Sequence, residues 1–279
     1  MSTEARDEYL EILTKPSSVE LSESGISHSV RFTFLGVTLL IGGPFVSIIV
    51  HYAIGDPFSI LLFMFSLLSG LILWFLGVLT VGDTLKVMRL KLAAHMLRSL
   101  SLHAVLAYDR GSSEAMKRVI KAEQEEKGFI VRAFRAIGVN VEQAFILGAL
   151  QGAMRASEMP YIMVYRNGIL DGASATLVSY VTAATIRSTT FIVALILLGL
   201  VMFIVSILAD PILVYTTART LRNHAKRENE IRRVLGLAET PAEAPGIGGL
   251  IVSLLTLGLY LPVYARNLEK SITTHILTH

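Results

Sequence analysis

The 279-residue chain contains no cysteine. This absence excludes disulfide bonds, thiolate metal sites and cysteine nucleophiles. Asparagine and glutamine are also scarce, with eight in total. Because a low content of these heat-sensitive residues is typical of hyperthermophile proteins, we expect a thermophilic source.

Charged residues are missing from four stretches: Phe32–Gly55, Pro57–Gly82, Ser188–Ala209 and Ala244–Ala265. At about 1.5 Å rise per residue, a helix of roughly twenty residues crosses a hydrocarbon core of roughly 30 Å. The chain is also 53% hydrophobic. The sequence therefore predicts an all-α, multi-pass integral protein of the cell membrane, with about four transmembrane helices and a helical cytoplasmic module.

The order of these runs divides the chain into four parts. We expect an exposed, partly helical leader over 1–30, a transmembrane hairpin over 31–82, a cytoplasmic module over 83–187 and a membrane region over 188–279. The Gly55-Asp56-Pro57 turn joins the first two helices as an antiparallel pair. The second run continues without proline to Asp109, which predicts one helix that leaves the membrane. Asp210-Pro211 closes the third run and precedes a basic helix over 212–235.

Basic residues follow the uncharged runs. Lys86, Arg89 and Lys91 come after the second run, and Arg219 and Arg222 come after the third. The positive-inside rule marks such segments as cytoplasmic. Each is either a solvated helix face or a surface that contacts anionic lipids.

The charge bias and the number of spans disagree. With four spans and a cytoplasmic 83–187 module, the basic 212–235 helix would face outward, against the positive-inside rule. One solution is a fifth, weak span over Gly172–Ile186; in the other, the final run re-enters or lies in the interface without crossing. The sequence leaves both open.

A stripe of small residues recurs every four positions at Ala144, Gly148, Gly152 and Ala156. This spacing places them on one helix face and permits close helix packing. We interpret the stripe as packing within the cytoplasmic module, with packing against a second copy of the chain as the alternative.

Groups that could carry chemistry are few. The runs contain no Asp, Glu, Lys or Arg and one histidine, His51, whereas an ion-coupled carrier needs ionisable groups at membrane depth. His275 and His279 have the four-residue spacing of metal ligands on a helix, but the favoured interpretation is a disordered tail. His95 and His103 have no acidic or histidine partner at i+3 or i+4. The sequence thus predicts no catalytic residue, no cofactor and no metal site.

The segment from Leu254 to Tyr264 carries a Leu-Thr-x-Gly-x-Tyr motif before a basic exit. This motif resembles the closing helix of an uncharacterised class of small prokaryotic membrane proteins. The resemblance covers about thirty residues, and it implies a membrane helix but no activity.

These patterns favour a non-enzymatic membrane subunit or scaffold of a membrane complex. Its expected partners are membrane lipids and other subunits or further copies of itself; nucleic acid is not indicated. A channel or transporter subunit is the alternative, and a lipid-acting membrane enzyme comes third.

Overall fold

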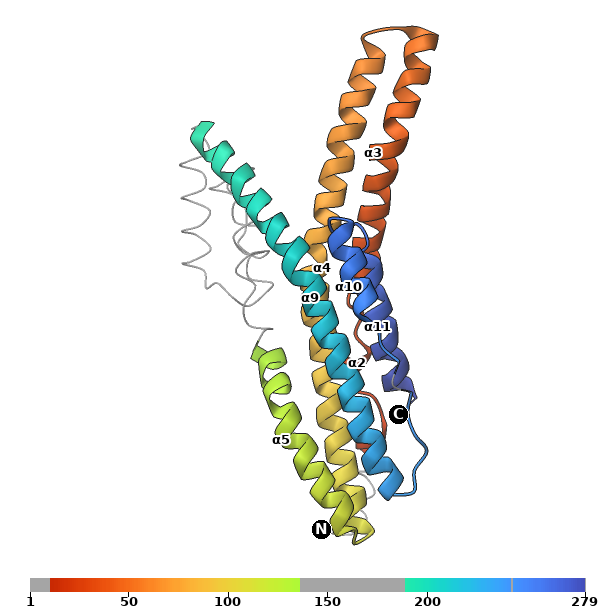
Figure 1. Cartoon of the computed structure of the whole chain (residues 1–279), viewed down its shortest axis with the longest axis vertical. Helices are drawn as coiled ribbons and strands as arrows, with labels where there is room; N and C mark the ends of the chain where they lie inside the picture. Colours follow the sequence, from red (N-terminus) through yellow and green to blue (C-terminus); the bar gives the residue numbers. More distant parts are fainter. Residues whose placement is uncertain (1–10, 136–188, 242, 279) are drawn as a thin grey trace. The chain divides into compact units, whose positions relative to one another are not determined.

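A computed structural model describes residues 11–135, 189–241 and 243–278. The elements in these ranges are all helices (Figure 1): α2 (Ser18–Leu21), α3 (Ile26–Ile54), α4 (Phe58–Asp109), α5 (Ser113–Arg135), α9 (Thr189–Val234), α10 (Ile247–Leu255) and α11 (Leu261–Leu277). The all-α prediction is therefore confirmed for the described residues.

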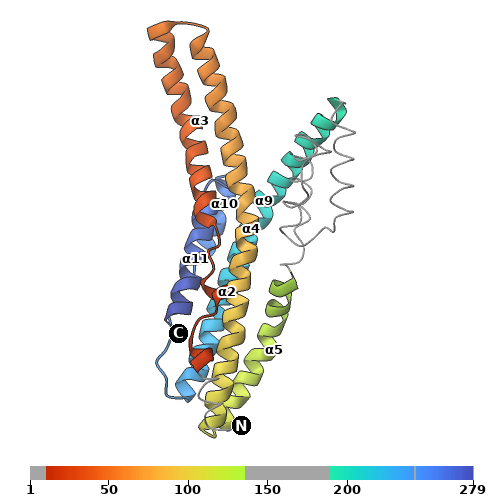
Figure 2. The same cartoon turned by 180° about the vertical axis from the view of Figure 1, so that it is seen from behind.

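Helices α3 and α4 form the antiparallel pair that the Gly55–Pro57 turn predicts, and Figure 2 shows them side by side from behind. Small residues bring the two backbones together. A Cβ atom added at Gly36 would lie 2.6 Å from the backbone nitrogen of Trp74, and one added at Gly77 would lie 2.1 Å from Oγ1 of Thr33. Glycine at these positions therefore permits the close approach of the two helices.

Three of the described helices are long and apolar enough to cross a membrane, and they contain α3, α4 and α9. Helix α4 continues from the second uncharged run to Asp109, as predicted. Helix α9 differs from the prediction, because it passes through Asp210 and Pro211 without ending. The third uncharged run and the basic 212–235 segment thus belong to one helix.

The fourth uncharged run is not one continuous helix, which corrects our expectation of a single transmembrane helix over Ala244–Ala265. It is divided into α10 and the start of α11 by a turn. Leu257 and Gly258 in this turn have φ values of 49° and 85°, a left-handed conformation that an α-helix cannot contain. A Cβ atom at Gly258 would lie 3.2 Å from Ile207 and 3.3 Å from Val78. The turn therefore packs where the uncharged parts of α4 and α9 end.

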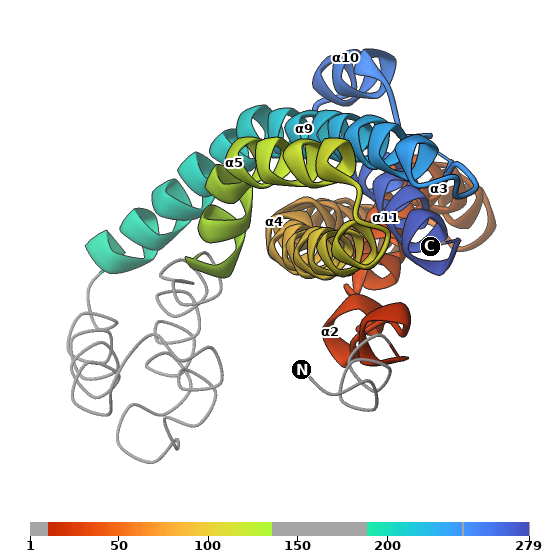
Figure 3. The same cartoon turned by 90° about the horizontal axis from the view of Figure 1, so that it is seen from below.

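Beyond the uncharged runs, the later parts of α4 and α9 pack together with α2 and α11, and Figure 3 shows these helices around α4. These four helices form a bundle with an apolar core. Its almost fully buried residues include Leu85, Met88, Leu92, Leu221 and Leu268. The leader is not uniformly exposed as expected, because Leu13, Glu20 and Ser24 are buried.

The chain divides into two compact units, one of Met1–Glu126 with Phe203–His279 and the other of Lys127–Met202. Every residue of the site described below belongs to the first unit. The small-residue stripe Ala144, Gly148, Gly152 and Ala156 lies outside the described residues, as do the predicted fifth span and residues 136–187 of the 83–187 module.

Candidate metal centre

Four buried side chains from three helices meet in the first unit. His95 comes from α4, His224 and Glu228 come from α9, and His275 comes from α11. Their potential ligand atoms all lie within 4.8 Å of one another. The three imidazole centroids are 5.0–5.6 Å apart, and each pair of rings meets edge to face. We call these four residues the His3Glu cluster.

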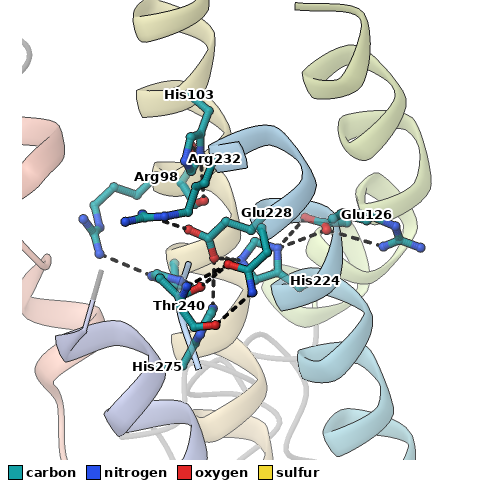
Figure 4. Close-up of polar contacts among 12 residues, drawn as sticks. Arg98, His103, Glu126, His224, Glu228, Arg232, Thr240 and His275 are labelled. Carbon is teal, nitrogen blue, oxygen red and sulfur yellow. Dashed lines mark hydrogen bonds and ion pairs between the residues drawn. The ribbon is translucent and has the colours of Figure 1, made fainter. Parts of the chain in front are cut away.

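The surrounding groups fix the orientation of two of the imidazoles (Figure 4). Nδ1 of His275 donates to the carbonyl oxygen of Pro241 at 3.0 Å, and Nδ1 of His224 donates to the carboxylate of Glu126 at 3.0 Å. A carbonyl and an ionised carboxylate only accept hydrogen bonds, so the proton must be on Nδ1 in both rings. In the neutral form, Nε2 of each ring then carries a lone pair.

His95 has the same arrangement, with Glu20 as its acceptor. Nδ1 of His95 lies 3.2 Å from Oε1 of Glu20, whose carboxylate also accepts from Nε of Arg98 at 2.9 Å. Nη2 of Arg98 is 3.3 Å from the same imidazole nitrogen, but an ionised carboxylate can bond to Nδ1 only if Nδ1 carries the proton. The nitrogen that His95 can offer to an ion is therefore again Nε2.

Glu228 supplies an oxygen ligand next to these nitrogens. Its Oε2 lies 3.1 Å from Nε2 of His275 and 3.7 Å from Nε2 of His224. Oε1 lies 3.6 Å from Nη1 of Arg232. Since His224 and Glu228 are four residues apart on α9, the helix itself places both on one face.

A short chain of polar contacts positions the Pro241 carbonyl. Oδ1 of Asn229 accepts from the backbone nitrogen of Thr240 at 2.8 Å, and Nδ2 of Asn229 donates to the carbonyl of Thr240 at 2.9 Å. These bonds hold the linker between α9 and α10 against α9. The next residue, Pro241, is thereby placed where it accepts from His275.

The electrostatic environment depends on burial and on the two carboxylates outside the cluster. Burial lowers the pKa of His95 to about 3, so this imidazole is neutral at pH 7. Burial opposes ionisation of Glu20, but hydrogen bonds from His95, Ser17 and Arg98 outweigh it and lower the pKa to about 2. Burial also opposes the charged form of His224, yet the hydrogen bond and charge of Glu126 raise its pKa. The environment of His224 therefore favours positive charge.

This arrangement fits a divalent transition-metal ion. Tetrahedral zinc sites use histidine nitrogens and carboxylate oxygens at about 2.0–2.2 Å, and iron and nickel also accept imidazole ligands. Metal-bound histidines commonly donate their other N–H to a carboxylate or a backbone carbonyl, as all three histidines of this cluster do. Such a closed set of four protein ligands is typical of structural zinc sites.

A surface pocket of about 380 Å³ reaches the cluster at His275. Its walls come from the linker and from α11, and they include Pro241, Lys270 and Thr274. Of the four cluster residues, His275 is the one that lines this pocket.

This candidate site was not predicted from the sequence. His275 lies buried in α11, so the prediction of a disordered tail is wrong at this residue. His95 gains its acidic partner from the distant leader, and His103 is buried on the same helix but is outside the cluster. The spacing of His224 and Glu228 is the signal that sequence reasoning could have used, because it is the i, i+4 pattern of helical metal ligands.

The predicted basic surface residues occupy different environments. Arg219 is exposed, whereas Lys86, Arg89 and Arg222 are partly buried. Lys91 is buried and forms an ion pair with Glu269 at 3.8 Å. Lys91 therefore contributes to packing inside the helix bundle.

No protein-family model, curated protein or solved structure matches the chain.

Proposed function

We propose that this chain is an integral membrane metalloprotein that binds one divalent transition-metal ion in the His3Glu cluster. The decisive observation is that Nδ1 of all three histidines is held by an outer acceptor, Glu20, Glu126 or Pro241. In its neutral form each imidazole can offer Nε2 to a metal ion, at His224 after loss of the proton that its raised pKa favours. Glu228 adds a carboxylate. A bound cation would accept the nitrogen lone pairs and compensate the negative charge of the Glu228 carboxylate.

The membrane setting follows from the uncharged runs. His95 lies thirteen residues beyond Gly82, and His224 lies fifteen residues beyond Ala209. At about 1.5 Å per residue, these positions are roughly 20 Å past the uncharged parts of α4 and α9. Because the flanking segments are basic, the positive-inside rule favours the cytoplasmic side of the cell membrane for the cluster. The broken fourth run supports the alternative in which that run re-enters or lies in the interface.

We propose that the ion has a structural role, within a non-enzymatic subunit or scaffold of a membrane complex. The four candidate ligands are buried and come from three helices, so an ion would tie α4, α9 and α11 together. Closed sites of this kind contribute directly to folding free energy. Self-association and a thermophilic source stay predictions.

Metal analysis of the purified protein tests the proposal. The protein should be prepared in mild detergent without a histidine tag, loaded with Zn²⁺, Fe²⁺ or Ni²⁺ and dialysed. We expect about one ion per chain, with Zn²⁺ retained best because four protein ligands suit its tetrahedral geometry. His224→Ala and Glu228→Gln should each lose most of the ion.

His103→Ala is the matched control, because it removes a buried histidine of α4 that is outside the cluster. This variant should retain the ion. A wild-type protein that keeps none of these ions, or equal metal content in all the variants, would refute the proposed function.

A further inference from the structure

We propose that metal occupancy controls the docking of the N-terminal leader, residues 11–25, through Glu20. This inference rests on the proposed metal site and adds a regulatory connection to it. The leader is attached to the bundle by contacts that converge on the outer side of His95.

Glu20 belongs to the leader and to the site at the same time. Within the leader, its carboxylate accepts from the backbone nitrogen of Ser17 at 2.7 Å and completes the capping box of α2. Toward α4, the same carboxylate accepts from His95 at 3.2 Å and from Arg98 at 2.9 Å. The Glu20 side chain is 0% exposed, so it is fully enclosed when the leader is docked.

Other residues of the leader also contact α4 and α11. Nη1 of Arg98 donates to the carbonyl of Leu13 at 2.9 Å. The backbone nitrogen of Ser24 donates to Oε1 of Glu269 on α11 at 3.3 Å. Leu13 is itself buried. The leader thus docks on α4 and α11, two of the helices that supply metal ligands.

An ion at Nε2 of His95 would strengthen this attachment. A metal ion withdraws electron density from the imidazole, so the Nδ1 proton becomes a better donor to the Glu20 carboxylate, which in turn raises the basicity of the ligand. The ion also fixes the ring orientation. Because coupling between two binding events is reciprocal, a docked leader must raise metal affinity by the same factor by which the ion favours docking.

The absence of cysteine allows a direct test with single introduced thiols. Ser24→Cys places a small, nearly isosteric thiol at a position that is 7% exposed in the docked leader. We expect chelation to raise its rate of maleimide labelling by about ten-fold or more, the lower bound of the usual effect of an outer carboxylate on metal affinity. Stoichiometric Zn²⁺ should restore the slow rate.

Two control thiols separate leader release from general unfolding. Leu97→Cys is at an exposed position of α4, and Ala93→Cys is at a fully buried one. Chelation should leave both labelling rates nearly unchanged. An equal rise at Ala93→Cys would show that the whole bundle opens and would overturn the specific role of the leader.

The reciprocal measurement is the Zn²⁺ affinity of Glu20→Gln. We expect it to fall by about 10–100-fold, whereas Glu11→Gln, which changes an exposed leader carboxylate paired with Lys15, should leave it unchanged. If the wild-type protein binds the ion but labelling of Ser24→Cys is insensitive to chelation, the leader inference fails and the proposed function stands. If the protein binds no ion, both fail.

Discussion

The two halves of helix α4 bury opposite kinds of side chain. From Phe58 to Gly82, small or hydroxyl residues such as Ser66 and Gly70 are buried, while large apolar residues such as Phe65 and Leu68 are exposed. Beyond Gly82 the pattern reverses, and the large side chains are inside. One continuous helix therefore changes its packing partners, and apolar outward faces of this kind are expected where lipid replaces water.

The packing of α4 cannot be described from its composition alone. In the first half, close backbone approach to α3 provides the packing, and the large side chains can contact lipid tails. In the second half, burial of large apolar groups away from water provides the driving force. His95, the α4 member of the His3Glu cluster, lies in this second half next to the buried apolar residues Leu92 and Met96.

The strongest test of this contrast is the same substitution in each half of α4. Leu92 is 0% exposed, whereas Leu68 is 61% exposed. We expect Leu92→Ala to lower the free energy of unfolding by about 2–5 kcal/mol, because it removes buried methyl groups and leaves a cavity. Leu68→Ala should change it by less than about 0.5 kcal/mol. Denaturant titration in mild detergent measures both changes in the free energy of unfolding. Equal losses would contradict the interpretation that Leu68 faces lipid while Leu92 lies in a buried apolar core.

The long helices were predictable because uncharged length and proline-free continuation are local properties. The break in the fourth run was not predicted, although Gly258 and Pro262 lie within it. Pro262 is in the first turn of α11, a position that proline favours. The turn also depends on packing against Val78 and Ile207, which are remote in sequence, so periodicity and composition alone do not define it.

A second pair of substitutions tests the close contact of α3 with α4. A Cβ atom at Gly36 would lie 2.6 Å from the backbone of Trp74, whereas one at Gly42 would have no neighbour within 4 Å. We expect Gly36→Ala to destabilise the hairpin by about 1–3 kcal/mol through overpacking. Gly42→Ala should cause no loss, because alanine is the better helix former. Thermal unfolding followed by circular dichroism distinguishes these outcomes.

The candidate metal site was less accessible to sequence reasoning than the helices. His224 and Glu228 share a local spacing, but His95 and His275 are more than forty residues away from them on either side. The outer acceptors Glu20 and Glu126 belong to further segments. Only tertiary packing brings these residues together, so a histidine that lacks a partner on its own helix need not lack one in the fold.

The smallest effect on stability, and the sharpest test of orientation, comes from labelling from the two sides of the membrane. Because His95 and His224 meet in one cluster, we expect the basic parts of α4 and α9 to lie on the same side of the membrane, as the positive-inside rule also favours. Single cysteines replacing exposed Leu97 and Lys226 should therefore react from the same side, and Tyr52→Cys, near the α3–α4 turn, should react from the other. An impermeant maleimide applied to intact cells and to inverted vesicles measures this. These surface changes should alter stability by less than about 0.5 kcal/mol, so misfolding would not explain the labelling pattern. Reaction of Leu97→Cys and Lys226→Cys from opposite sides of the membrane would exclude the His3Glu cluster.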